Sequence, residues 1–293
     1  AFGVGTETAV SASAVNDGKW RHCVAKRDGN TGRFALYIDG KLEAVSEGAR
    51  GELPAFDGLM AKDRLEDVQL FNYVLCQGEI DEYAGQRFKA AEFRFAEASG
   101  GTIVDSSAYG KNGTLHGGAV RSFGDPGHTV KFNGVDAYGL IKRNISDDFT
   151  IMFWLKTDDA GGEGAWYDGK GIIDGRRIGA ANDFGISLVG GKLAFGTGPD
   201  GFTIRSGSDV NDNVWHHCAV TRRRSDGRMR IYVDGKQEAE GCGTNNSLFS
   251  SYELSIGRIH DGTNYLRGEI GGLTMYGEAF SSEKILSFAN RNL

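Results

Sequence analysis

DVNDNVWHHCAVTRRRSDGRMRIYVDGK, residues 209–236, is the stretch that decides the fold, because residues 14–41 repeat it as AVNDGKWRHCVAKRDGNTGRFALYIDGK. The two segments keep a constant spacing of 195 residues, so that Trp20 and Trp215 occupy the same position. A match without gaps over this length indicates an internal repeat. Part of the chain is therefore predicted to be a duplicated domain.

Each copy of the repeat predicts a β-hairpin followed by a second tight turn. Two apolar runs of strand length flank a polar turn in the later copy, and Asp-Gly pairs stand at 226–227, 234–235 and 39–40. Such pairs supply the positive φ that hairpin turns require. We expect the matched tryptophans to face the core, because a large apolar ring at the start of a strand is usually buried. The repeat is thus predicted to be scaffold.

Composition favours an all-β chain. The 293 residues include 45 glycines and only 3 prolines, which is typical of many short strands joined by tight turns. The longest apolar run, residues 149–156, is predicted to be a central strand. The net charge of −6 argues against a nucleic-acid partner, whose phosphates require a basic face. No run of about 18 apolar residues is present, so we expect no membrane span.

The matching segments divide the chain into three parts. Residues 1–83 correspond to the later part of a domain, residues 84–91 form a short apolar junction, and residues 92–293 form a complete domain. A short helix is predicted to close each copy, and Ser281 is expected to cap the second of these helices. The four cysteines are predicted to be free thiols.

The first copy lacks counterparts of roughly residues 92–193. A sandwich without half of its strands would expose unpaired edges and a bare apolar face. Three explanations stay open: a trimmed chain, a partner chain that completes the sheet, or a fragment that pairs against the full domain. We favour strands supplied by another polypeptide.

A family resemblance rests on several segments together, namely EFRF at 92–95, DSSAYGKNG at 105–113, VKFNGVDAY at 130–138, FTIMFWL at 149–155, VWHH at 214–217 and IYVDGK at 231–236. The set resembles a laminin-G-like (LamG, concanavalin A-like) jelly-roll domain. The resemblance implies a sandwich of two antiparallel sheets, often with one Ca²⁺ ion at its rim. Calcium takes oxygen ligands, and those available on predicted turns are Asp105, Asn112, Asp136, Asp174, Asn182 and Asp183.

The fold implied by the resemblance serves sugar binding, adhesion, enzyme appendages and structural parts alike. Family-16 glycoside hydrolases share it and carry acidic residues on alternate positions of one strand. The near match in this chain is Glu79-Ile-Asp-Glu-Tyr, which lies in a predicted helix. Retaining hydrolysis needs two carboxylates held about 5 Å apart, so we do not predict an enzyme.

We predict a non-catalytic binding and adhesion module that recognises glycans or a protein surface. Glycan recognition uses an aromatic platform and planar polar side chains. A long glycine-rich loop and a second loop, which the jelly roll would bring nearby, offer Trp166, Tyr167, Asp168, Arg176, Arg177, His260, Asn264 and Tyr265. The competing interpretation of Trp166 is that it only anchors its loop.

Two other functions stay open. The first is a structural assembly protein of a surface layer, filament or virion, whose incomplete first domain is completed by strands from another polypeptide. The second is an accessory domain of a polysaccharide-degrading enzyme. An extracellular or cell-surface location is expected, although free cysteines and the lack of a recognisable signal peptide also fit a viral or cytoplasmically assembled protein.

Overall fold

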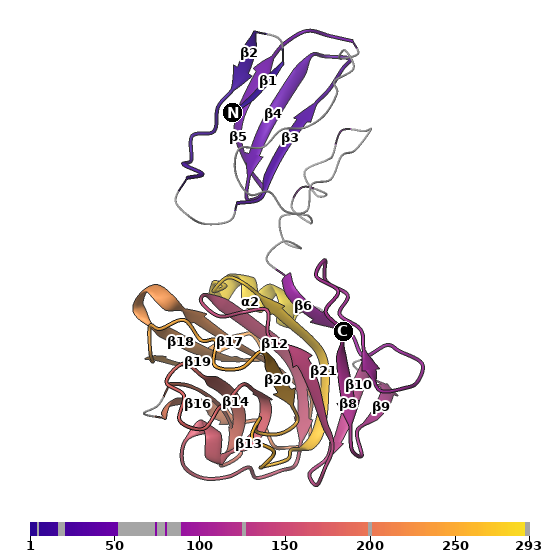
Figure 1. Ribbon diagram of the computed structural model, residues 1–293, viewed down its shortest axis with the longest axis vertical. Helices are drawn as coiled ribbons and strands as arrows, with labels where there is room; N and C mark the ends of the chain where they lie inside the picture. The colour runs from indigo at the N-terminus through magenta and orange to yellow at the C-terminus, as the bar shows by residue number, and fades with distance from the viewer. Residues whose placement is uncertain are drawn as a thin grey trace. The chain divides into compact units, whose positions relative to one another are not determined.

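The computed structural model describes residues 1–4, 6–16, 21–51, 74, 80, 89–124, 127–198 and 201–290. The chain divides into two compact units, Ala1–Arg87 and Phe88–Leu293. Antiparallel strands make up nearly all of the regular structure in both (Figure 1). The all-β prediction is therefore confirmed.

The second unit is a sandwich of two eight-stranded sheets. The first, called the β12 sheet, has the order β19-β18-β17-β12-β21-β10-β9, with β6 also paired to β21. The predicted central strand is β12, which lies between β17 and β21. The strands of this sheet are β6 (Lys89–Phe93), β9 (Val120–Gly124), β10 (Gly127–Asn133), β12 (Phe149–Thr157), β17 (His216–Arg223), β18 (Arg228–Val233), β19 (Lys236–Cys242) and β21 (Arg267–Tyr276).

The second sheet, called the β14 sheet, has the order β16-β15-β14-β13-β20-β11-β8-β7. Several neighbours in this order are far apart in the chain, as expected for a jelly roll. Its strands are β7 (Thr102–Ile103), β8 (Gly113–His116), β11 (Tyr138–Lys142), β13 (Lys170–Asp174), β14 (Phe184–Val189), β15 (Lys192–Thr197), β16 (Phe202–Asp209) and β20 (Glu253–Ile256).

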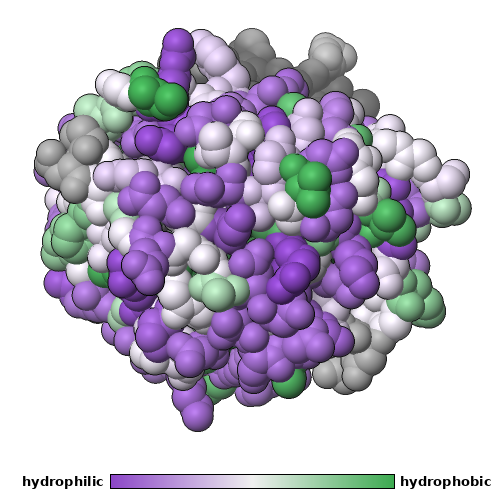
Figure 2. Space-filling model, turned by 90° about the horizontal axis from the view of Figure 1, so that it is seen from below, coloured by the Kyte–Doolittle hydropathy of each residue, from purple (hydrophilic) through white to green (hydrophobic). Residues whose placement is uncertain are grey.

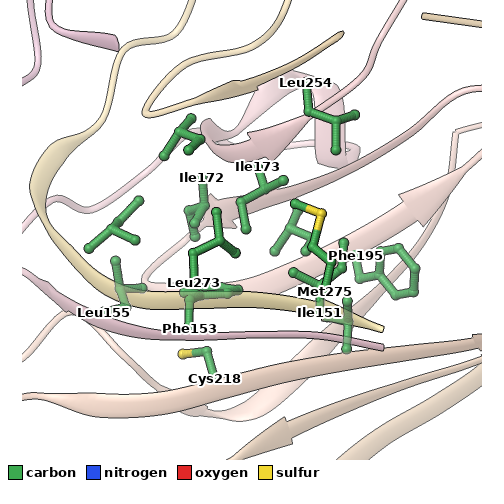
Figure 3. Close-up of a cluster of buried hydrophobic side chains, with 14 of the residues drawn as sticks. Ile151, Phe153, Leu155, Ile172, Ile173, Phe195, Cys218, Leu254, Leu273 and Met275 are labelled. Atoms are coloured by element: carbon green, nitrogen blue, oxygen red, sulfur yellow. The ribbon is translucent and has the colours of Figure 1, made fainter. Parts of the chain in front are cut away.

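One apolar core lies between the two sheets (Figure 3). Alternate residues of β12 point inward, and the Phe149 ring contacts the Phe195 ring of the β14 sheet with centroids 6.0 Å apart. Burial of each side chain of this size stabilises the fold by roughly 1.5–3 kcal/mol. A shift of one residue in the pairing register of β12 would turn all of its inward side chains to the outer face and lose this contribution along the whole strand.

Two of the cysteines that the structure describes, Cys218 and Cys242, are free thiols, as predicted. Cys218 is part of the core between the sheets. Cys76 lies outside the described residues.

The structure also corrects one expectation. Trp215 precedes β17, which begins at His216, and is not among the residues of the core between the sheets. Trp215 is only half-buried, and the prediction that it faces the core is wrong. Trp20 lies outside the described residues.

A short helix, α2 (Ser282–Ala289), covers the outer face of the β12 sheet, where Ile285 packs with Tyr232 and Phe280. The Ser281 hydroxyl accepts a hydrogen bond from the Lys284 amide at 3.3 Å, which is the predicted N-cap. In the first copy the corresponding helix lies outside the described residues except for Ile80, which is helical and packs with Tyr37.

The first unit contains a two-stranded sheet and a three-stranded sheet. The first pairs β1 (Phe2–Val4) with β2 (Glu7–Ala9), and the second has the order β3 (Cys23–Arg27), β4 (Arg33–Ile38), β5 (Lys41–Glu47). Cys23 pairs with Ile38 as Cys218 pairs with Val233. The register shift after Leu36 also recurs after Ile231. The repeat found in the sequence thus extends to strand register.

The molecular surface seen in Figure 2 is mostly hydrophilic, with hydrophobic residues scattered over it. Scattered apolar residues are usual on protein surfaces. Within the described part of the chain, no helix has the length and apolar character needed to span a membrane.

Candidate functional site

The outer face of the β14 sheet carries most of the predicted binding residues. Ile141 of β11 faces the core, so Tyr138 of the same strand faces outward, opposite His116 of β8. Two strands further along the sheet, Asp174 pairs with Ser255 and lies on this same outer face. The register of four strands therefore brings polar and aromatic groups from distant segments together.

Trp166 covers the β14–β15 part of this face and is fully buried. Its ring fits there because Gly185 and Gly196 have no side chain: a Cβ at these positions would lie 2.4 Å and 1.8 Å from the indole. The Trp166 amide donates to the Thr203 hydroxyl at 3.0 Å, and the Ser187 hydroxyl donates to the Trp166 carbonyl at 2.6 Å. The indole therefore anchors its loop and offers no exposed ring to a ligand.

Asp174 joins the two loops that hold the binding candidates. Its Oδ1 accepts hydrogen bonds from the backbone amides of Arg176 at 2.9 Å and His260 at 2.8 Å. Its Oδ2 is buried and has no hydrogen-bond partner among the described residues. Burial raises the pKa of Asp174 to about 7. The buried Asp174 carboxyl therefore holds the loop of Arg176 and the loop of His260 next to each other.

The first group of side chains forms around Tyr167. The Arg176 guanidinium lies 4.6 Å from the centre of the Tyr167 ring, which is cation–π distance, and pairs with Asp261 at 2.8 Å. The Asn264 side-chain amide donates to the carbonyls of Tyr167 at 3.4 Å and Asp168 at 3.3 Å. Arg176 and Asp261 keep 25% and 14% of their side-chain surface exposed, so a ligand can reach both.

The second group forms around Tyr138. The Arg258 guanidinium lies 3.5 Å from the centre of the Tyr138 ring and donates to the Tyr265 hydroxyl at 3.1 Å. The His116 ring stacks on Tyr138 with centroids 4.8 Å apart and planes 15° apart. The two groups together are called the outer-face cluster, and its members are His116, Tyr138, Tyr167, Arg176, Arg258, Asp261, Asn264 and Tyr265.

Three predicted binding residues have other local partners. Asp168 accepts a hydrogen bond from the Ala165 amide at 2.9 Å and so caps its own turn. The exposed Arg177 reaches the Ser250 carbonyl at 3.5 Å. The His260 ring lies between the hydroxyls of Ser251 and Ser255 at 3.2 and 3.0 Å. Burial, followed by the nearby Arg258, lowers the pKa of His260, so its ring is neutral at pH 7.

Sequence reasoning missed four members of the outer-face cluster: His116, Tyr138, Arg258 and Asp261. Two-residue alternation in 113–116 and 138–142 does place His116 and Tyr138 on one face of their own strands. Nothing in the sequence indicates that these two strands are neighbours. Arg258 and Asp261 lie in the loop of the predicted His260, and each also has a partner from another segment, Tyr138 and Arg176 respectively.

Three of the proposed calcium ligands are occupied by hydrogen bonds of their own loops. The Asp105 carboxylate accepts the amides of Glu92, Ser107 and Lys111 at 2.9–3.0 Å, and Asn112 in turn accepts the Asp105 amide at 3.0 Å. Such bonds are the usual role of turn aspartates and asparagines.

Asp136 accepts hydrogen bonds from the Asn133 side chain at 2.7 Å and from the Gly118 amide at 3.1 Å. The bond from Asn133, followed by that from Gly118, lowers the pKa of Asp136. This third residue therefore also serves its own turn rather than a metal.

The remaining proposed ligands, Asp174, Asn182 and Asp183, lie where β13 ends and β14 begins. Asp183 accepts the Arg177 amide at 3.2 Å, and burial raises its pKa. One buried oxygen each of Asp174 and Asp183 has no hydrogen-bond partner among the described residues, but calcium takes six to eight oxygens. No group of three or more His, Cys, Asp or Glu side chains suited to a metal occurs within the described residues. Calcium binding at Asp174, Asn182 and Asp183 therefore stays a prediction.

Comparisons of the sequence with known proteins identify a family and relatives in rat and mouse. The Laminin_G_3 family model, described as the concanavalin A-like lectin/glucanases superfamily, matches residues 132–286. The rat (Rattus norvegicus) protein "Sushi, von Willebrand factor type A, EGF and pentraxin domain-containing protein 1" is 26% identical over 150 residues, which are 48% of this chain and 4% of that protein. Its mouse (Mus musculus) counterpart is 28% identical over 113 residues, 39% of this chain and 3% of that protein. The chain thus spans a small part of each relative.

Solved structures with a similar fold include botulinum toxin domains. A structure of botulinum neurotoxin type C matches with a TM-score of 0.57 and 17% identity, over 71% of this chain and 52% of that one. The binding domain of botulinum neurotoxin DC matches with a TM-score of 0.56 and 15% sequence identity, over 70% of this chain and 52% of that one. The binding domain of Paraclostridial Mosquitocidal Protein 1 matches with a TM-score of 0.56 and 16% sequence identity, over 70% of this chain and 52% of that one. The chain spans about half of each, and at these identities the likeness concerns the fold.

The family resemblance drawn from the sequence is confirmed by the sandwich and by the family model. That model covers more than half of the chain. The protein therefore belongs to the concanavalin A-like lectin/glucanases superfamily.

Proposed function

We propose that the second unit is a non-catalytic module that binds glycans through the outer-face cluster. The observation that carries this proposal is that planar polar groups, Arg176 with Asp261 and Arg258, are held beside tyrosine rings on one accessible face. Sugars are recognised by planar hydrogen-bonding groups together with aromatic rings. Because these side chains already hold one another, ligand binding would require little additional ordering.

Two proteins of similar fold have partners of different classes. Botulinum neurotoxin type C interacts with two ganglioside molecules, and the botulinum neurotoxin DC binding domain forms a complex with rat synaptotagmin II. For this chain the small, polar cluster favours a glycan. A stable protein interface usually takes about 800 Å² from each partner and has an apolar centre.

The buried acids support binding rather than bond cleavage. Asp174 and Asp183 are the carboxyls whose pKa is raised among the described residues, and a raised pKa is one mark of a general acid. A general acid must also reach the substrate, yet Asp174 is completely buried and Trp166 lies against the same stretch of sheet. Two backbone amides already occupy its Oδ1.

The test is a titration of the full chain against a panel of oligosaccharides, followed by tryptophan fluorescence, since Trp166 lies 5.4 Å from Tyr167. We expect saturable binding that weakens roughly tenfold or more in Arg176→Ala and in Arg258→Ala, about the loss of one charge-assisted hydrogen bond. The matched control is Arg224→Ala, on a turn of the β12 sheet, which should bind normally. The absence of a saturable response to every sugar, or release of hydrolysis products, contradicts the proposal.

We also propose that residues 1–83 are the C-terminal half of a second domain of this family, completed by strands from another polypeptide. The repeated register supports the first part, and β17 supports the second, because in the complete unit it pairs with β12. Light scattering tests it: a lone chain whose residues 1–83 resist protease would contradict strand completion. An extracellular or cell-surface location would suit both proposals.

A further inference from the structure

Two loops of the second unit lie next to each other at one end of the β14 sheet. The first joins β13 to β14 and covers residues 175–183, and the second joins β19 to β20 and covers residues 243–252. The Ser250 amide donates to the Asn182 carbonyl at 3.3 Å, and the Ser250 hydroxyl donates to the Gly175 carbonyl at 3.3 Å. These hydrogen bonds hold the two loops together.

An arginine from a third segment fixes the backbone of the second loop. The Arg143 guanidinium donates to the carbonyls of Ile145 and Leu248 at 2.8 Å each, and also to the carbonyl of Ser251. The Arg143 amide donates to the Tyr252 carbonyl at 3.0 Å. Leu248 itself is part of the core between the sheets. The backbone of this loop is therefore held from Leu248 to Tyr252.

Three large apolar side chains of these two loops lie in solvent. Ile178, Phe249 and Tyr252 keep 75%, 60% and 88% of their surface exposed, and we call them the apolar tips. The Arg177 guanidinium donates to the Ser250 carbonyl at 3.5 Å, which joins the turn of Ile178 to the turn of Phe249. A single exposed apolar residue is ordinary, whereas several on adjoining loops mark an interaction site.

The charge around the apolar tips is positive. Neither loop contains a glutamate, and their one aspartate, Asp183, is buried. Of the two arginines, Arg176 belongs to the outer-face cluster, whereas Arg177 is exposed and forms no ion pair among the described residues. The acid that follows the second loop, Glu253, pairs with Lys142 at 2.7 Å. This end of the sheet therefore presents a positive charge beside apolar side chains.

We propose that the apolar tips dock the second unit onto a membrane surface that contains anionic lipid. Ile178 and Phe249 enter the boundary between headgroups and acyl chains, the Tyr252 ring lies at headgroup level, and Arg177 lies at the lipid phosphates. Buried apolar area and attraction to anionic lipid both strengthen such binding. Aromatic rings with a polar atom are favoured at this depth.

The size of the apolar tips favours a membrane over a protein partner. A stable protein interface takes roughly 20–30 residues from each partner, whereas the tips are three side chains on two turns. A bilayer needs no matching surface relief, because its headgroup region admits single apolar side chains. Since Arg143 already fixes the second loop, docking requires little additional ordering.

The test is co-sedimentation of the full chain with sugar-free vesicles, made either of phosphatidylserine with phosphatidylcholine or of phosphatidylcholine alone. We expect stronger binding to the anionic vesicles. Phe249→Ser combined with Tyr252→Ser should weaken binding roughly tenfold or more, because both rings stay in water. Arg177→Gln should weaken binding several-fold on the anionic vesicles only.

The matched control is Val135→Ser. Val135 is 73% exposed, close to the exposure of Ile178, but it lies in the turn before β11, whereas Tyr252 lies beyond the other end of that strand. This variant should bind vesicles like the parent. The apolar tips are exposed, so we expect unchanged melting temperatures for all of these variants.

A variant that keeps an aromatic ring measures insertion directly. The fluorescence of Tyr252→Trp should be quenched by lipids with brominated acyl chains, more than that of the parent. The proposal is overturned if the parent does not bind anionic vesicles, if the folded double variant binds like the parent, or if Tyr252→Trp shows no additional quenching. A dimer of the parent that the double variant loses, without vesicle binding, would assign the tips to a second copy of the chain. Because the vesicles carry no sugar, none of these results bears on glycan binding.

Discussion

The two copies of the hairpin, residues 14–51 and 209–246, keep the same backbone bonds while their outer faces differ. In both, an aspartate at the second turn accepts a backbone amide, from His22 to Asp39 at 2.8 Å and from His217 to Asp234 at 2.9 Å. The contacts that hold the chain in its turns are thus the same in the two copies. Side chains on the outer face differ, and apolar residues of the first copy stand where the second has the ion pair of Arg230 and Glu240.

One repeated arginine shows how the surroundings change the role of a residue. Arg27 donates to the carbonyls of Ala49 and Gly51 at 2.6 and 2.8 Å. Arg222 donates to the equivalent carbonyls and also to those of Ser146 and Asp147. Arg222 is completely buried, and burial lowers its pKa to about 10, so it is still protonated at pH 7. The additional partners come from strand connections that only the second unit has among the described residues.

The largest expected effect comes from removing this arginine. Arg222→Met should destabilise the second unit by about 3–5 kcal/mol, because several buried carbonyls lose a charged donor at once. Arg27→Met, the matched control, should destabilise the first unit much less, because Arg27 is partly exposed. Calorimetry of the full chain measures both transitions. Equal losses would mean that burial does not distinguish the two positions.

The second prediction concerns pH. The pKa of Asp174 is about 7 in the folded protein, against an ordinary value of 3.8, so the folded state binds more protons than the unfolded state between these values. The stability of the second unit should therefore fall as pH rises from about 4 to 7. Asp174→Asn should reduce this dependence, leaving the smaller contribution of Asp183, and be more stable at pH 8, on the order of 4 kcal/mol at most.

The measurement for Asp174 is the melting temperature of the second unit at pH 5 and pH 8, in the parent and in the variant. The first-unit transition serves as an internal control, because this substitution does not touch it. Parallel pH profiles of parent and Asp174→Asn would show that the carboxyl is already ionised in the fold.

A smaller effect is expected for a hydrogen-bonded pair that both copies share. The Ser208 hydroxyl and amide both donate to Glu238, at 2.7 and 2.8 Å, and Ser13 does the same to Glu43, at 2.8 Å for each bond. Ser208→Ala should cost about 0.5–1 kcal/mol in the second unit. Ser13→Ala should lower the first-unit transition in the same direction. Urea unfolding gives both values, and opposite signs would mean that the two bonds are not equivalent.

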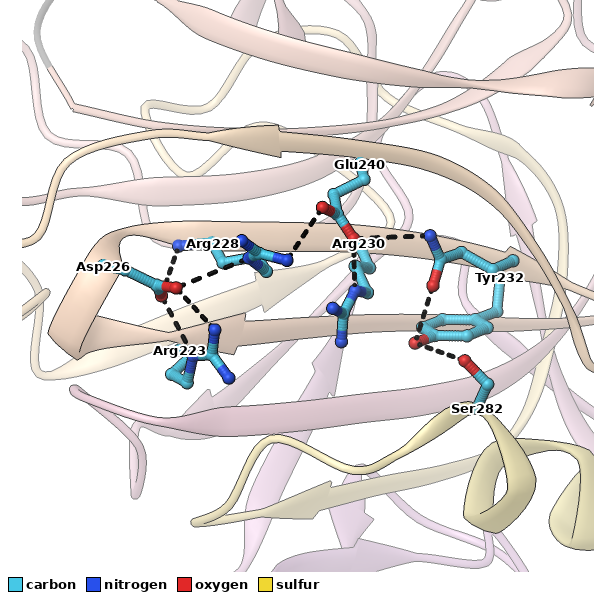
Figure 4. Close-up of polar contacts among 8 residues, drawn as sticks. Arg223, Asp226, Arg228, Arg230, Tyr232, Glu240 and Ser282 are labelled. Carbon is cyan, nitrogen blue, oxygen red and sulfur yellow. Dashed lines mark hydrogen bonds and ion pairs between the residues drawn. The ribbon is translucent and has the colours of Figure 1, made fainter.

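The smallest effect is expected for the charge ladder, the row of charged and polar side chains on the outer face of β18 and β19 in the second unit (Figure 4). Glu240→Ala breaks exposed ion pairs with Arg228 and Arg230 and should cost less than about 1 kcal/mol, because solvent and salt screen them. Thermal unfolding at low salt and at about 1 M salt checks this, and the difference between parent and variant should shrink with salt. A large loss that does not depend on salt would show that the ladder stabilises the sheet by packing.

The fold could be predicted in more detail than the site. Repeats, glycine-rich turns and apolar alternation are local, so strands, hairpins and the cap at Ser281 followed from neighbouring residues. Trp166 is the contrary case. Its position in a glycine-rich loop is typical of a ligand platform, but Gly185 and Gly196, on two later strands, provide the surface that buries it.

The sequence alone determined that the chain is an all-β protein of this superfamily with a repeated hairpin segment, because the two-residue alternation and the repeated turns are local features of the sequence. Tertiary structure decided which strands are neighbours, and hence that His116, Tyr138 and Arg258 meet on one face. It also decided that Ile178, Phe249 and Tyr252 are exposed on adjoining loops. The reason is physical: alternation specifies which face of its own strand a side chain takes, whereas the partner strand depends on long-range pairing that packs the core as a whole.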